Sequence, residues 1–165
     1  MAQSIQKEKT VYMGFSTDMI HSGHISIIQK AAQLGKVIVG LLSDEAVASY
    51  KRYPLLPYTE RKTLFENIRG VDRVVEQTEL SYRKNLEVLK PDYVVHGDDW
   101  REGFQKPVRD EVVQILESYG GQLVEYPYTQ DDKFADLEKR ARAELSLPDV
   151  RRARLKKTIA MKGLV

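Results

Sequence analysis

The feature of this chain that most constrains its fold is a regular alternation between short apolar runs and segments with the apolar spacing of helices. The expected strands are residues 10–15, 36–42, 72–77, 92–97 and 122–127. The expected helices are residues 22–34, 44–50, 59–70, 82–90 and 107–121. Short β-branched runs that alternate with helices are typical of a parallel sheet covered on both faces. The sequence therefore predicts an α/β fold, with an open parallel five-stranded sheet and helices on both faces.

The composition is that of an ordinary globular protein. With 165 residues, 42% apolar and 30% charged, the chain is long enough to bury one core and too apolar for a disordered protein. The sequence contains no cysteine, which excludes a disulfide, a thiolate nucleophile and a zinc–thiolate cluster. Residues 1–10 lack the apolar core of a signal peptide, and no apolar run approaches the length of a membrane span. We therefore expect a cytoplasmic protein with no membrane partner.

The charge is unevenly distributed along the chain. Residues 139–165 contain nine Lys and Arg against Glu144 and Asp149, which leaves 17 of the 26 basic and 22 of the 24 acidic residues in the rest. A basic tail can bind nucleic acid, but no aromatic residues stand between these arginines to stack on bases. A solvated helix or linker is the favoured interpretation, so no nucleic-acid partner is expected. Residues 1–147 are expected to form the domain, and residues 148–165 a basic tail that links it to a further domain.

Polar segments directly follow three of the expected strands. Residues 14–24 (GFSTDMIHSGH) follow the first strand, residues 41–46 (LLSDEA) the second, and residues 96–100 (HGDDW) the fourth. In an open parallel sheet, ligands bind at the carboxyl ends of the strands. All three histidines of the chain fall within the first and the last of these segments. The sequence therefore predicts a ligand site at this edge of the sheet.

The turn that holds His21 and His24 has the features of an anion site. A helix N-terminus presents unpaired backbone N–H groups and the positive end of the helix dipole. Gly14 and Gly23 allow a bulky ligand to approach the backbone closely. Imidazoles that begin a helix can donate hydrogen bonds to phosphoryl oxygens, and phosphoryl transfer mostly needs such positioning and charge stabilisation. The alternative is that the two histidines are merely polar residues of a first turn.

The H-x-G-H motif after this strand resembles that of the nucleotidylyltransferase superfamily, which implies a Rossmann-like sheet. The closer similarity is to the cytidylyltransferases that make CDP-glycerol, CDP-choline and CMP-phosphonates. It runs from Val11 to about Tyr128 and includes residues 40–46 (GLLSDEA) and 94–100 (VVHGDDW). The sequence is most similar to cytidylyltransferase domains fused to phosphoenolpyruvate mutase in phosphonate antibiotic biosynthesis of the fosfomycin or aminoethylphosphonate type. The tail resembles the segment that leads into the mutase.

The resemblance implies a role for each residue that matches the family's motifs. The implied catalytic residues are His21 and His24, which would contact the triphosphate and stabilise the transition state, and Lys51, which would bind the α-phosphate and the incoming substrate. The implied nucleotide-binding residues are Gly14, Phe15, Ser16, Gly23, Arg61, His96, Asp98, Asp99, Trp100, Tyr128 and Thr129. The alternatives are that Lys51 and Arg61 are ordinary surface charges, and that Trp100 is a core anchor whose N–H finds a partner.

The reaction implied by the resemblance fits these residue types. An oxygen of a small phosphonate, such as 2-hydroxyethylphosphonate or 2-aminoethylphosphonate, or of a phosphate attacks the α-phosphorus of CTP, and pyrophosphate leaves. Because the nucleophile is already ionised, no general base is required, which explains cations and imidazoles without a Ser-His-Asp set. Mg²⁺ should accompany the triphosphate. The family also implies a homodimer, formed through the region of residues 66–75.

One segment departs from the family's pattern. After the last strand, family members usually carry a phosphate signature with glycine and hydroxyl groups, whereas this chain has residues 131–135 (DDKFA). Carboxylates cap a helix well but make a poor anion site. Two alternatives to an active transferase therefore stay open. They are a degenerate nucleotide-binding or scaffold module, and a metal hydrolase with His21, His24, His96 and Asp98 as ligands. An adenylyltransferase of the same fold is a variant of the first interpretation.

Overall fold

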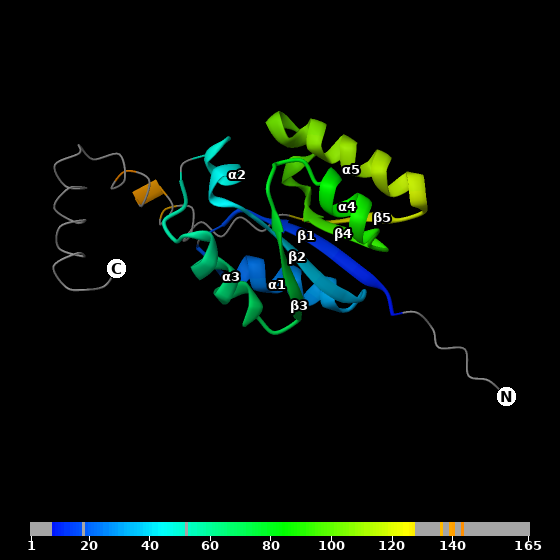
Figure 1. Cartoon of the computed structure of the whole chain (residues 1–165), viewed down its shortest axis with the longest axis horizontal. Helices are drawn as coiled ribbons and strands as arrows, with labels where there is room; N and C mark the ends of the chain where they lie inside the picture. Colours follow the sequence, from blue (N-terminus) through cyan, green and yellow to red (C-terminus); the bar gives the residue numbers. More distant parts are fainter. Residues whose placement is uncertain are drawn as a thin grey trace. The chain divides into compact units, whose positions relative to one another are not determined.

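Five parallel strands form one sheet in the order β3-β2-β1-β4-β5 (Figure 1). The computed structural model describes residues 8–17, 19–51, 53–127, 136, 139, 140 and 143. The strands are β1 (Thr10–Phe15), β2 (Lys36–Leu42), β3 (Val71–Gln77), β4 (Tyr93–Gly97) and β5 (Gln122–Tyr126). The predicted α/β fold with a five-stranded parallel sheet is confirmed. Central β1 lies between β2 and β4, so the three segments that carry polar motifs leave the sheet side by side.

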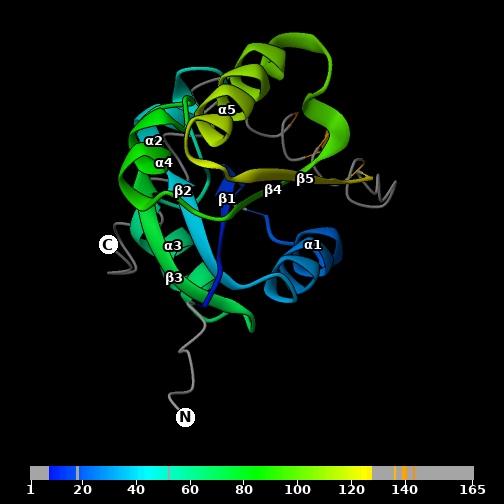
Figure 2. The same cartoon turned by 90° about the vertical axis from the view of Figure 1, so that its right-hand side faces the viewer.

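Helices cover both faces of the sheet, with α1 and α3 on one side and α4 and α5 on the other (Figure 2). The helices are α1 (Ser22–Ala32), α2 (Asp44–Ala48), α3 (Tyr58–Glu66), α4 (Arg83–Leu89) and α5 (Lys106–Tyr119), with short 3-10 turns η1 (Asp98–Trp100) and η2 (Gly103–Gln105). In the described part of the chain, no helix is long and apolar enough to cross a membrane.

Most element boundaries lie within a few residues of their expected positions, but α3 ends before the expected stop at Gly70. Asn67 already leaves the helical conformation, with φ −99° and ψ 5°. The N–H groups of Asn67 and Ile68 donate to carbonyls three residues back, which is the tighter bonding common in a last helical turn. Gly70 instead shapes the turn into β3, with φ +101°, a conformation that glycine adopts at little cost.

The chain divides into two units, residues 1–129 and residues 130–165. The first unit contains the sheet and all the elements named above. In the second, residues 136, 139, 140 and 143 are helical, and Arg140 Nε lies 3.1 Å from Asp136 Oδ2. The expected domain limit between residues 147 and 148 lies outside the described residues and stays a prediction.

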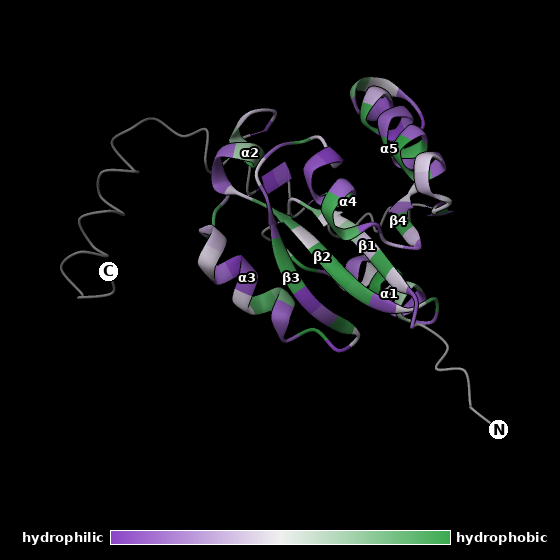
Figure 3. Cartoon of the chain, turned by 45° about the vertical axis from the view of Figure 1, so that its right-hand side comes forward, coloured by the Kyte–Doolittle hydropathy of each residue, from purple (hydrophilic) through white to green (hydrophobic). Residues whose placement is uncertain are grey.

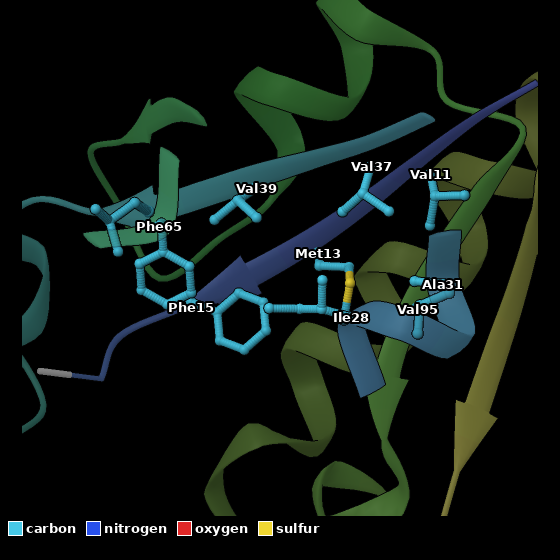
Figure 4. Packing of buried hydrophobic residues seen from close by; sticks show 10 residues of the cluster. Val11, Met13, Phe15, Ile28, Ala31, Val37, Val39, Phe65 and Val95 are labelled. Carbon is cyan, nitrogen blue, oxygen red and sulfur yellow. The ribbon is translucent and has the colours of Figure 1, made fainter. Parts of the chain in front are cut away.

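The sheet separates two apolar layers because successive residues of a strand point to opposite faces. Figure 3 shows the apolar character of β1 and β2 at the centre of the sheet. The layer under α1 and α3, shown in Figure 4, consists of Val11, Met13, Phe15, Ile28, Ala31, Val37, Val39, Leu41, Phe65 and Val95. The layer under α4 and α5 consists of Tyr12, Ile38, Tyr82, Leu86, Val94, Trp100, Val112, Ile115 and Leu116.

A buried polar network crosses the second layer. The Tyr12 hydroxyl donates to Gln77 Oε1 at 2.7 Å and accepts from Asn85 Nδ2 at 2.9 Å. Gln77 Nε2 in turn donates to the backbone carbonyls of Glu79 and Leu80. Because each buried group has a partner, the network fixes the strand end of β3 and the start of α4 without leaving an unsatisfied polar atom.

Gly40 leaves the room that the Tyr12 hydroxyl occupies. A Cβ atom at position 40 would lie 1.8 Å from Tyr12 Oη, so Gly40→Ala must displace the tyrosine from its hydrogen bonds. We expect the free energy of unfolding to fall by about 2–4 kcal/mol, as measured by urea denaturation. Gly103→Ala is the control, since nothing lies within 4 Å of its Cβ position and only its positive φ opposes the change. Equal losses in the two variants would contradict the packing argument.

Candidate functional site

His21 and His24 begin α1 and close its first turn with their own rings. Gly23 N–H donates to His21 Nδ1 at 3.1 Å, and His21 N–H donates to His24 Nδ1 at 3.3 Å. This is the reciprocal arrangement of a capping box, with histidine in both positions. The ring centroids are 3.9 Å apart. The structure therefore brings the two predicted catalytic imidazoles together at the helix N-terminus.

The cap also decides which ring nitrogen of each histidine carries the hydrogen. A backbone N–H can only donate, so both Nδ1 atoms accept, and each neutral ring must carry its hydrogen on Nε2. Both Nε2 atoms are therefore hydrogen-bond donors. The amide of Gly23 is used by the cap, which gives this predicted nucleotide-binding residue a structural role as well.

Phe15 packs against His24. The two rings meet edge to face, with centroids 5.8 Å apart. The centroid of the Phe65 ring lies 5.0 Å from that of Phe15. Phe15 is buried in the layer under α1 and α3 (Figure 4). Its aromatic side chain is therefore part of the core, which leaves its backbone for the predicted contact with a nucleotide.

Lys51 reaches the same strand end from a segment that follows α2. Its Nζ donates to Ser16 Oγ at 2.9 Å, and it lies 5.2 Å from the centre of the Tyr50 ring. Ser16 comes directly after β1, five residues before His21. The structure thus brings Lys51 and Ser16 together at the end of the strand that leads to the two histidines.

Arg61 is fully buried, so the alternative that it is a surface charge is wrong. Its Nη2 donates to Leu42 O at 2.8 Å and to Asp44 Oδ1 at 2.7 Å, and its Nε donates to Leu56 O at 3.2 Å. Asp44 also accepts from Tyr58 N–H. Arg61 therefore fastens the end of β2, the start of α2 and the segment that contains Lys51.

The Arg61 side chain also carries a group that stays unsatisfied. Among the described residues, its buried Nη1 has no hydrogen-bond partner. Burial of an unpaired guanidinium nitrogen costs free energy, whereas a ligand oxygen or a water molecule could satisfy it. The predicted nucleotide role of Arg61 stays a prediction, beside the structural role that its three contacts define.

His96, in β4, and Trp100, in η1, form a stacked pair. Their ring centroids are 3.7 Å apart with an angle of 9° between the planes. His96 Nδ1 lies 2.9 Å from the Gly97 carbonyl, which can only accept, so this nitrogen carries the hydrogen and Nε2 is an acceptor. Burial lowers the pKa of His96, which favours the neutral ring. Asp99 Oδ1 is 3.8 Å from the same nitrogen.

Trp100 is buried, and its indole N–H donates to Glu125 Oε1 at 2.8 Å. This is the contact expected of a core anchor, the alternative that the sequence left open. Glu125 also accepts from Arg109 and Arg101, at 2.8 to 3.1 Å. A carboxylate at the end of β5 thus fixes the turn that carries Trp100, on which His96 stacks. The hydrogen bond with Arg109 is the main cause that lowers the pKa of Glu125 to about 2.

The hydrogen bonds of Glu125 with Trp100, Arg101 and Arg109 should make the free energy of unfolding depend on pH in the acid range. The Glu125 pKa of about 2 in the folded state lies below the ordinary value of 4.5, so its contribution is complete above pH 4.5 and is lost as the pH falls toward 2. We expect Glu125→Gln to lower the free energy of unfolding at pH 7 by about 1–3 kcal/mol. Denaturation curves between pH 7 and 3 should show a shallower acid dependence in the variant. Parallel curves would contradict the assignment.

Gly14 has a different environment from the one expected. A Cβ at this position would lie 2.2 Å from Tyr82 Oη, so the space beside Gly14 is filled by a side chain of the protein itself. Tyr128, Thr129 and residues 131–135 lie outside the described residues, and the predictions for them stay predictions. No group of three or more His, Asp or Glu residues that could hold a metal ion occurs in the described ranges. The metal-hydrolase alternative therefore gains no ligand set there.

Sequence reasoning missed several residues that build this site. In the sequence, Tyr50 and Tyr82 stand in expected helices and Glu125 in the last expected strand, where none of them indicates a site. Asp44 carried a weak signal, because an acidic residue after Ser43 is typical of a helix start. The contacts of Tyr82 with Gly14 and of Glu125 with Trp100 are not local in sequence, so no spacing rule could have revealed them.

Comparison with known families identifies the type of site. The profile of the cytidylyltransferase-like family matches residues 13–153, most of the chain. The chain belongs to the cytidylyltransferase-like family. The match includes the capped histidine pair, Lys51, Arg61 and the turn after β4, so the nucleotidyltransferase interpretation of the sequence is confirmed at this level.

Several curated proteins share part of this cytidylyltransferase-like chain. Ethanolamine-phosphate cytidylyltransferase of Arabidopsis thaliana is 35% identical over 100 residues, which cover 57% of this chain and 24% of the relative. Bifunctional protein HldE of Hahella chejuensis is 31% identical over 121 residues, 70% of this chain and 24% of the relative. FAD synthase of Ferroglobus placidus is 30% identical over 106 residues, which cover 59% of this chain and 70% of the relative. The alignments thus span about a quarter of the first two relatives.

Solved structures support the fold. A lipopolysaccharide core biosynthesis protein of Thermoplasma volcanium superposes with a TM-score of 0.63 at 21% identity, and the match covers 74% of this chain and 99% of that protein. Pantothenate synthetase of Thermus thermophilus has a TM-score of 0.53 at 15% identity, over 78% of this chain and 59% of the other. At these identities the likeness shows the arrangement of strands and helices, and it agrees with the Rossmann-like sheet.

Proposed function

We propose that this cytidylyltransferase-like protein transfers CMP from CTP to an oxygen of a small phosphate or phosphonate acceptor and releases pyrophosphate. The observation that carries the proposal is the convergence of the two capped imidazoles and Lys51 at the end of β1, in a chain of this family. The Nε2–H groups of His21 and His24 supply donors for phosphoryl oxygens, and Lys51 supplies a positive charge beside Ser16.

The proposed step is a direct displacement. An ionised acceptor oxygen forms a bond to the α-phosphorus as the bond to the β-phosphate oxygen breaks, and the leaving pyrophosphate takes the electron pair. Negative charge therefore builds up on the phosphoryl oxygens, where imidazole N–H groups and a helix N-terminus stabilise it. Because the acceptor is already an anion, this chain needs no base to remove a proton, in agreement with rings whose Nδ1 atoms serve the backbone.

Magnesium stays a prediction for this protein. In the described residues, no group of three or more carboxylates or imidazoles is arranged to hold a metal ion. When bound, Mg²⁺ would neutralise charge on the triphosphate, and its ligands would be mostly phosphate oxygens and water, as is usual for this ion. Residues 131–135, the acidic segment that departs from the family's pattern, fall outside the described ranges. Their effect on CTP binding is therefore also open to test.

Acceptor identity is the finer part of the proposal. The similarity to ethanolamine-phosphate cytidylyltransferase supports phosphoethanolamine, and the sequence resemblance to mutase-fused domains supports 2-aminoethylphosphonate and 2-hydroxyethylphosphonate. These acceptors share a tetrahedral anion on a short polar chain. A mutase domain after residue 165 and a homodimer through residues 66–75 are further predictions from the same resemblance.

Adenylyl transfer is the second candidate, because one relative is an FAD synthase. The test of both is pyrophosphate release from CTP or ATP with each acceptor in turn, in the presence of Mg²⁺. We expect release from CTP with at least one phosphate or phosphonate acceptor, and a nucleotidyl product of the corresponding mass. Release from ATP alone would favour the adenylyltransferase, and no release from either nucleotide would favour the degenerate module.

A further inference from the structure

Tyr82 lies at the carboxyl edge of the sheet, and its ring is enclosed by the protein. The residue directly precedes α4 and is 5% exposed. Its ring meets Tyr12 edge to face at 5.6 Å and Trp100 at 5.8 Å. Its hydroxyl lies against the backbone of Gly14, where a Cβ atom would be 2.2 Å from Tyr82 Oη. The packing therefore holds the hydroxyl beside the end of β1.

Among the described residues, the Tyr82 hydroxyl has no hydrogen-bond partner, whereas the Tyr82 backbone carbonyl accepts from Leu86 N–H at 2.9 Å. The neighbouring polar groups are satisfied, since Tyr12 Oη binds Gln77 and Asn85, and Trp100 Nε1 binds Glu125. A hydroxyl that the protein leaves without a partner can donate a hydrogen bond to a ligand. Burial raises the pKa of Tyr82 well above 10, so the hydroxyl keeps its hydrogen and can donate.

The surroundings of the hydroxyl indicate what its partner is. Ser16 follows Gly14 by two residues and so lies on the same side of the extended chain. Ser16 Oγ accepts from Lys51, and a hydrogen bond with Ser16 opposes the rise that burial causes in the pKa of Tyr50. Phe15, between Gly14 and Ser16, points to the opposite layer, where it contacts His24. The Tyr82 hydroxyl and Lys51 therefore lie on the same side of the chain at the end of β1.

We propose that Tyr82 is an acceptor-binding residue, whose hydroxyl donates a hydrogen bond to the phosphate or phosphonate group that Lys51 holds. The inference rests on the proposed function, and it assigns the two sides of the strand end to the two substrates. The imidazoles on the α1 side face the triphosphate, and Tyr82, Ser16 and Lys51 on the α4 side face the acceptor. A donor that packing has already positioned loses little entropy when the acceptor binds.

The test compares Tyr82→Phe with Tyr119→Phe. The Tyr119 hydroxyl is buried without a partner among the described residues, but it lies near Asp92, which precedes β4 at the opposite edge of the sheet. Loss of one hydrogen bond to an anion should raise the KM for the acceptor by about 10–100-fold in Tyr82→Phe. The KM for CTP should stay within about twofold, and thermal stability should not fall, because an unpaired hydroxyl is removed. Tyr119→Phe should change neither KM.

A normal acceptor KM in Tyr82→Phe overturns the inference, and so does a raised KM for CTP alone, because the hydroxyl would then serve the nucleotide. Failure of the proposed function looks different, since wild-type protein would release no pyrophosphate with any acceptor. Calorimetry with phosphoethanolamine and with 2-aminoethylphosphonate as probes needs no turnover. Weaker binding in Tyr82→Phe than in wild type supports the assignment in that case too, and equal or absent binding in both proteins contradicts it.

Discussion

Replacing His24 by alanine is expected to lower kcat by about 10²–10³-fold, the usual effect of losing one preorganised donor to transition-state charge. The structure supports the donor role, because backbone contacts place the hydrogen of the ring on Nε2. His24 also caps α1, so His24→Ala should in addition lower the free energy of unfolding by about 1 kcal/mol. Steady-state kinetics at saturating CTP and acceptor measure the first effect, and urea denaturation the second.

His24→Gln separates catalysis from capping. Glutamine at the third helical position is a natural capping-box residue, and its side-chain oxygen can accept from His21 N–H as the imidazole does. We expect this variant to regain most of the stability that His24→Ala loses. Its kcat should stay well below that of wild type, because the amide does not place a donor where Nε2–H lies. Full activity in either variant would remove His24 from the catalytic machinery.

The second large effect is expected for Lys51→Met. Loss of the ammonium beside Ser16 should lower kcat/KM by about 10²–10³-fold, since a charge that binds the α-phosphate and the acceptor acts in both ground and transition state. Methionine retains an apolar stem of similar length against Tyr50, so the fold should be little affected. The readout is kcat/KM for each substrate in turn.

A matched control for this change is Lys62→Met on α3. Lys62 is a partly exposed lysine that pairs with Glu66 one turn along the same helix, an interaction worth little in water. Its replacement should leave kcat/KM within about twofold of wild type. If Lys62→Met and Lys51→Met reduce activity equally, general charge explains the effect. If neither variant loses activity, Lys51 is an ordinary surface charge, which is the alternative given in the sequence analysis.

Tyr82 and Lys51 together define how the proposed site would choose its acceptor. One offers a neutral hydroxyl from an enclosed ring, and the other an ammonium on a flexible stem. For an acceptor that carries two negative charges, loss of either residue should raise the KM. For an uncharged hydroxyl compound, loss of either residue should leave the KM unchanged. The kinetics of the two single variants and the double variant would show whether they act on one group, because residues that share a ligand are not additive.

The sequence by itself determined the strands, the parallel sheet and the helix that begins with the histidine pair. Strands β1 and β2 start and end at the expected residues, because a short apolar run is a local signal. The position of His21 and His24 on a helix N-terminus follows equally from local pattern, since spacing and capping involve residues only a few positions apart. The family resemblance then supplied Lys51 and Arg61 as candidates without showing where they lie.

Only the tertiary structure decided what those candidates touch. Lys51 meets Ser16 across 35 positions of sequence, and Trp100 meets Glu125 across 25. Arg61 turned out to be buried because three carbonyl and carboxylate groups from separate elements surround it, and residue type alone favours the surface for arginine. The approach of the Tyr82 hydroxyl to Gly14 likewise joins residues that are far apart in the sequence. Which side chains meet depends on how sheet and helices pack, and packing sums many non-local contacts that no short pattern encodes.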